Sequence, residues 1–112
     1  MSDAVQDLGL AGRTVAAYEL AWARFQEFCD ARGLTALPAA PATVRSFVTC
    51  LHHGALRAEG EPRRSFPRGS IEVHLAAVRW KHDTTGVQPR FRTPELTTLL
   101  KGIENEQKHV VE

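Results

Sequence analysis

The sequence predicts an all-α fold, a compact bundle of four helices. Apolar residues recur at steps of three and four in four stretches, which is the spacing of one helix face. Glycine, proline or a small polar residue stands at the ends of these stretches, and none of them shows the alternation of a half-buried strand. The length of 112 residues suits a single domain with one modest core.

The first helix is expected from about Gly12 to Arg32, because Gly33 can end it in a left-handed conformation. Residues 1–11 are expected to be loosely ordered. The inward stripe of this helix comprises Val15, Tyr18, Trp22, Phe25 and Cys29.

The second helix is expected to open at Pro41, a favourable first helical residue, and to end near Gly54 or Leu56. Residues 57–69 contain two Pro, two Gly and four Arg, and so predict an exposed loop. The inward stripe of the second helix comprises Val44, Phe47, Val48 and Leu51.

The third helix is expected to start with Ser70 as its cap and to run to about Thr85, where Gly86 stops it. In the fourth, Thr93 is the expected cap and Pro94 the first residue, and the chain is expected to fray after Asn105. The domain would thus span 12–107, with a tail at 108–112. The two stripes comprise Ile71, Leu75, Val78 and His82, and then Leu96, Leu99, Leu100 and Ile103.

The sequence gives no sign of catalysis. It has no nucleophile with a base and an orienting partner, and no phosphate-binding glycine motif. Cys50, His52 and His53 lack a second ligand pair at zinc spacing, and the two cysteines are expected to be reduced thiols. We therefore expect no enzyme activity, no metal and no cofactor. No membrane-length apolar run or signal peptide is visible, so a cytoplasmic or other intracellular location is expected.

Positive charge is concentrated in one third of the chain. Residues 57–92 hold eight basic residues against four acids, whereas the whole chain has a net charge of only +1. This distribution indicates an anionic partner such as nucleic acid. Within it, Arg63, Arg64 and Arg68 fall in the predicted loop.

The outer faces of the first and third helices offer a second candidate surface. Two interpretations remain open, because an outward Trp is costly unless something covers it. Either the third helix is buried on both sides, or this face meets a partner. The residues opposite the inward stripes are Arg13, Ala17, Leu20 and Arg24 on the first helix, and Val73, Ala77, Trp80 and Thr84 on the third.

Four motifs, in order, resemble the N-terminal core-binding domain of tyrosine recombinases and phage integrases. They are RTVAAYELAWARFQEFCDARG, LPAAPATVRSFVTCL, SIEVHLAAVRWKHDTTGVQP and ELTTLLKGIENE, and together they cover roughly residues 12–107. The resemblance implies a SAM-like helical domain that clamps duplex DNA, beside a separate catalytic domain and other recombinase protomers. Carried over by position, it implies DNA contacts from Arg13, Thr14, Ala17, Ser70, Val73, Ala77, Trp80, Lys81 and Arg90.

Two departures from the family pattern stand out. Ala17, Val73 and Ala77 occupy places where relatives often carry polar or basic side chains, and the Arg-rich segment 57–69 is longer than the usual connection. The catalytic residues of the family belong to its C-terminal domain and have no counterpart here. The rival hypothesis is a helical protein–protein interaction module, favoured by the near-zero net charge and the apolar outer face of the third helix.

Overall fold

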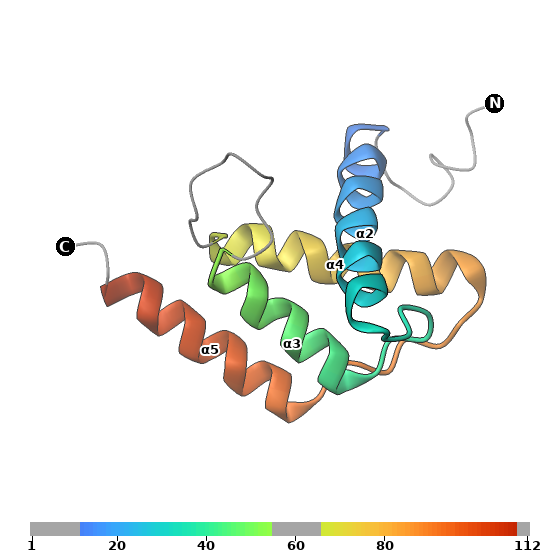
Figure 1. The fold of residues 1–112 in the computed structure, drawn as a ribbon. Helices are drawn as coiled ribbons and strands as arrows, with labels where there is room; N and C mark the ends of the chain where they lie inside the picture. The colour runs from blue at the N-terminus through green and yellow to red at the C-terminus, as the bar shows by residue number, and fades with distance from the viewer. Residues whose placement is uncertain (1–11, 55–65, 110–112) are drawn as a thin grey trace.

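The computed structural model describes residues 12–54 and 66–109, and its regular structure within these ranges is entirely helical. The helices are α2 (Gly12–Arg32), α3 (Pro41–His52), α4 (Arg68–Thr85) and α5 (Pro94–His109), shown in Figure 1. The predicted all-α bundle of four helices is confirmed for the described residues. None of these helices is long and apolar enough to cross a membrane.

Two predicted glycine stops are confirmed. Gly33 and Gly86 have φ values of +67° and +78°, a conformation in which a side chain would be strained. The residue after each glycine turns its N–H back to the helix: Leu34 donates to the Cys29 carbonyl at 2.9 Å, and Val87 donates to the His82 carbonyl at 2.9 Å. These bonds satisfy carbonyls that the helix ends leave free.

The start of α4 differs from the expectation. The helix begins at Arg68, so Ser70 is not its cap. The side chain of Gln107 on α5 does part of this work, because its Oε1 accepts the Arg68 N–H at 3.1 Å and its Nε2 donates to the Phe66 carbonyl at 3.0 Å. The same contacts hold the end of α5, which continues to His109 rather than fraying after Asn105.

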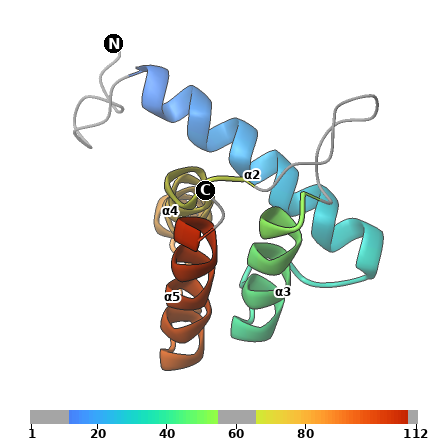
Figure 2. The ribbon, with the colours of Figure 1, turned by 90° about the vertical axis from the view of Figure 1, so that its left-hand side faces the viewer.

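The cap predicted for α5 is confirmed, since Thr93 Oγ1 accepts the Leu96 N–H at 3.3 Å. Helices α3 and α5 lie side by side and run in the same direction (Figures 1 and 2). Their carboxyl ends are joined by His52 Nε2 and Glu106 Oε1, 2.6 Å apart. Helices α2 and α4 form the rest of the bundle (Figure 1).

Helix α2 crosses α4 steeply instead of running along it (Figure 1), and this is the most extensive contact between two helices. On one side of the crossing, the rings of Tyr18 and Trp80 have centroids 5.9 Å apart. On the other side, Arg24 Nη1 lies 2.9 Å from His74 Nε2. Tyr18 and Arg24 on α2 thus lie opposite Trp80 and His74 on α4. On each helix the residues at the crossing are spaced three positions apart, and two rows with this spacing pack at a steep angle.

Ala21 and Ala77 occupy the middle of these two rows and are 3% and 0% exposed. The prediction that Ala77 faces outward and contacts DNA is therefore wrong. It is wrong because α4 is central: α2 covers the His74–Ala77 side, while Ile71, Leu75 and Val78 face the rest of the core. Of the two interpretations left open, burial of α4 on two sides is correct over much of its length.

The core contains most of the predicted stripe residues, with Phe25 and Phe47 at its centre and their ring centroids 4.9 Å apart. Four predicted core residues are only half-buried. Two of them, Val15 and Tyr18, lie in the projecting amino-terminal part of α2, where none of residues 12–20 is buried. The other two, Trp22 and Leu99, pack against the core from its edge. Three buried rings were not anticipated, namely Phe28, Phe66 and Phe91.

His82 is buried on the inward stripe of α4, as the sequence predicted. Its Nε2 accepts the Ala39 N–H at 3.0 Å, and its Nδ1–H donates to the Val78 carbonyl at 2.7 Å. The ring is 0% exposed and ties α4 to the segment before α3. Both cysteines are free thiols, with Cys29 buried and Cys50 half-buried.

Phe25→Ala is expected to lower the free energy of unfolding by about 3–5 kcal/mol, because it removes a completely buried ring. Leu20→Ala is the matched control on the same helix, since Leu20 is 64% exposed, and should change stability by less than about 0.5 kcal/mol. Urea denaturation followed by circular dichroism measures both. Equal effects at the two sites would contradict the proposed core.

Ala77→Glu is expected to destabilise the fold by at least about 3 kcal/mol, because it places a carboxylate and one further carbon in the α2–α4 crossing. Thermal unfolding provides the measurement, with the exposed neighbour Val73→Glu as control. A variant at position 77 with wild-type stability would show that the helices do not meet there.

Candidate nucleic-acid interface

The predicted site residues of α2 follow one side of the helix. Arg13 and Ala17 are exposed and Thr14 is half-buried, all in the projecting amino-terminal part. Figure 2 shows this part of α2 extending past the other helices. Arg13 is thereby held away from the core, at an exposed position that a phosphate can reach.

Arg24 is more constrained than the sequence suggested. Its guanidinium lies 5.2 Å from the centroid of the Phe66 ring and donates to His74 Nε2. Because Arg24 can only donate, His74 Nε2 must be unprotonated, and its Nδ1–H donates to the Ser70 carbonyl at 2.8 Å. Burial, more than the nearby Arg24 charge, lowers the pKa of His74. Arg24 therefore serves the α2–α4 packing first.

Arg68 and Arg92 share one carboxylate. Arg68 pairs with Glu72 one turn further along α4, and Arg92 Nη2 lies 3.2 Å from Glu72 Oε1. Burial of the Glu72 carboxyl opposes its ionisation, but the hydrogen bonds and charges of the two arginines outweigh this effect and lower its pKa. The cluster carries a net positive charge and ties the connector before α5 to α4.

The outer face of α4 is partly apolar. Val73 is 39% exposed, and Ser70 and Trp80 are half-buried. The Lys81 ammonium lies 5.7 Å from the Trp80 ring centroid and 6.0 Å from that of Trp22, so its charge is placed over two aromatic rings. The predicted outward position of Trp80 is thus only half correct, because Tyr18 covers one side of its ring.

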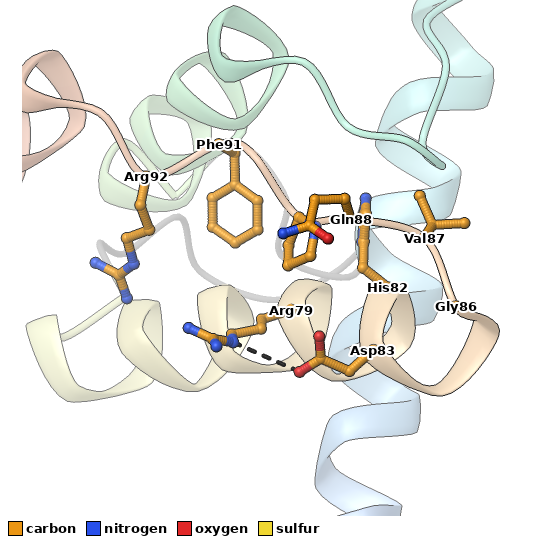
Figure 3. Close-up of a pocket in the computed structure, with 9 residues that line it drawn as sticks. Arg79, His82, Asp83, Gly86, Val87, Gln88, Phe91 and Arg92 are labelled. Atoms are coloured by element: carbon orange, nitrogen blue, oxygen red, sulfur yellow. Dashed lines mark ion pairs between the residues drawn. The ribbon is translucent and has the colours of Figure 1, made fainter.

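Arg90 is exposed on the connector between α4 and α5. Its neighbours Pro89 and Phe91 line a pocket against the carboxyl-terminal half of α4, shown in Figure 3. Two cations of this region that were not among the predicted site residues, Arg79 and Arg92, also line it. Both lie within residues 57–92, so the concentration of positive charge there is the sequence signal that could have identified them.

Three predicted cations lie on α4 or on the elements next to it. Arg13 is on α2, Lys81 on α4 lies over the Trp22 ring of α2, and Arg90 is on the connector, between two residues that line the pocket with Arg79 and Arg92. Arg63 and Arg64 fall outside the described residues. Within the described ranges no set of three or more metal-binding side chains is gathered.

No protein-family model matches the chain, and no curated protein and no solved structure is significantly similar to it.

His74 gives the folded protein a pH dependence whose sign follows from its neutral state. Its pKa in the folded protein lies below the ordinary value of 6.5, so the unfolded chain takes up this proton first as the pH falls. The contribution to stability is complete above about pH 6.5 and is lost as the pH falls toward the pKa in the folded state, with a slope of at most about 1.4 kcal/mol per pH unit.

Urea unfolding at pH 7.5 and pH 5.5 tests this. His74→Gln should reduce the loss of stability between the two pH values, whereas the same change at the exposed His53 should leave it as in the wild type. An undiminished pH dependence in His74→Gln would show that another group causes it.

Proposed function

We propose that this chain is a helical domain that binds duplex DNA along the exposed face of α4, mainly through backbone phosphates. Its relation to the core-binding domain of tyrosine recombinases is part of the proposal and rests on the order of the four sequence motifs. A catalytic domain elsewhere in a recombinase would then cut and rejoin the strands that this domain holds.

The observation that carries the proposal is the charge of α4 and the connector after it. Residues 66–92 contain five basic side chains against two acids, whereas the other described residues contain six of each. The two acids are both paired, Glu72 with two arginines and Asp83 with Arg79 at 3.5 Å. The cations that remain exposed therefore dominate the field on this side of the molecule.

The arrangement around α4 supports a clamp on the backbone. A duplex lying along the face that contains Val73 and Trp80 would meet Arg13 and Lys81 on one side and Arg90 on the other. The face itself offers few hydrogen-bond donors to base edges, so orientation by phosphates rather than sequence readout is expected. Affinity should accordingly be modest and strongly dependent on salt.

The rival function, a protein–protein interaction module, is favoured by a different observation. Leu20 is 64% exposed and Val73 39% exposed, and the Tyr18–Trp80 pair is only half-buried. Exposed aliphatic and aromatic side chains of this kind are typical of protein interfaces. Burial of Ala77 weakens this alternative, because it interrupts the apolar outer face that the sequence suggested.

Binding to a mixed-sequence duplex at several salt concentrations separates the two functions. If about four phosphates are neutralised, log K should fall with log salt at a slope of about −4, with a dissociation constant roughly micromolar at physiological salt. Fluorescence anisotropy of a labelled duplex measures this. Absence of salt-dependent association would contradict the DNA proposal and favour the protein partner.

Paired variants locate the contacts. Arg13→Gln with Arg90→Gln should flatten the salt slope by about two units, one for each lost phosphate contact. Lys101→Gln with Lys108→Gln removes the same charge from exposed positions on α5 and should leave the slope unchanged. Equal effects of the two pairs would indicate non-specific attraction instead of a defined surface.

A further inference from the structure

A pocket lies between the carboxyl-terminal half of α4 and the connector that leads to α5 (Figure 3). Its volume is about 390 Å³, which falls in the range of small-molecule sites. The proposed contacts with duplex phosphates lie on the outer surface and make no use of this cavity.

The floor of the pocket rests on two buried rings. The rings of His82 and Phe91 lie with their centroids 6.3 Å apart and are 0% and 2% exposed, so they support the pocket but offer a ligand almost no surface. Both His82 nitrogens are already bonded within the protein. The accessible apolar lining comes from Val87 and Pro89, which are half-buried. A flat apolar group can pack against these two side chains.

The mouth of the pocket is cationic. Figure 3 shows the guanidinium groups of Arg79, from α4, and Arg92, from the connector, on the same side of the cavity. Arg92 uses one N–H on Glu72, and Arg79 has only a 3.5 Å charge contact with Asp83, so both retain N–H groups for an anion with several oxygens. Both side chains are more than half exposed.

Two polar side chains complete the lining. The Gln88 amide can donate and accept, and the Asp83 carboxylate can accept from an amino group. Gln88 and Asp83 suit the polar edges of a planar base, the apolar lining suits its face, and the two arginines suit an attached phosphate. These are the parts of one nucleotide.

We propose that this pocket binds a single nucleotide, with its base against Pro89 and Val87 and its phosphate on Arg79 and Arg92. The nucleotide can come from solution or from an unpaired position of a DNA strand, because a base stacked in a duplex cannot enter. The site goes beyond the proposed duplex binding and does not depend on it.

Calorimetric titration of the whole chain with 2′-deoxyadenosine 5′-monophosphate tests the pocket, and deoxyadenosine and inorganic phosphate serve as partial probes. The nucleotide should bind, and each partial probe should bind at least about tenfold more weakly. Deoxyadenosine lacks the charged contacts of the phosphate, and inorganic phosphate lacks the apolar contact of the base. Absence of nucleotide binding would overturn the proposal. If inorganic phosphate binds as tightly as the nucleotide, the proposal is also overturned, since the base would then contribute nothing to binding.

Arg79→Gln should weaken nucleotide binding by about tenfold or more. Because its ion pair with Asp83 is exposed, the substitution should leave the fold intact. Lys101→Gln is the control, because Lys101 is an exposed cation on α5, outside the pocket and outside the proposed duplex contacts. Circular dichroism checks that both variants are folded. Equal weakening by the two substitutions would indicate general attraction of anions and contradict the site.

Oligonucleotides then distinguish the source of the ligand from the proposed function. A single strand that competes with the nucleotide, and loses this competition in Arg79→Gln, identifies unpaired DNA as a source; a single strand that does not compete identifies the free nucleotide. Duplex binding without nucleotide binding overturns the pocket and leaves the proposed function standing. Nucleotide binding without duplex binding overturns the proposed function and leaves the pocket standing.

Discussion

The close crossing of α2 over α4 organises this molecule. Ala21 and Ala77 sit at its centre, and their small size lets the two backbones approach until longer side chains meet on either side. There Tyr18 packs on Trp80, and Arg24 binds His74. A steep crossing buries only one part of each helix. The amino-terminal turns of α2 consequently extend past the core and carry Arg13 into solvent, while one face of α4 stays open.

The same crossing explains why α4 needs other elements to complete its burial. Its Ile71–Leu75–Val78 side packs into the core formed with α3 and α5, and its carboxyl-terminal half is covered by the connector that carries Phe91. His82 lies between the two regions, because its Nε2 accepts the Ala39 N–H and its ring lies 6.3 Å from that of Phe91 on the connector. The connector is thus held by a buried ring and by the Arg92–Glu72 bond, which makes the adjoining pocket a fixed feature of the fold.

Charge and packing are coupled at the proposed interface. Arg68 belongs to the basic segment 57–92 and Arg24 to α2, yet each has an internal partner that limits what it can offer a ligand. Arg13, Arg79 and Arg90 are exposed, and Arg79 has only a 3.5 Å ion pair with Asp83. A net charge of +1 over the chain conceals this local excess, because nine of the 13 acids lie outside residues 57–92.

The sequence by itself determined the four helices, their stops at Gly33 and Gly86, the cap at Thr93 and most of the core stripe, because these features depend on local spacing and backbone preference. Only the tertiary structure decided the role of Ala77, the burial of Phe28, Phe66 and Phe91, and the Gln107 cap of α4. Periodicity identifies one apolar stripe for each helix, but it does not tell how many neighbours a helix has. A small residue such as alanine fits an exposed face and a tight crossing equally well, so the distinction required the position of α2.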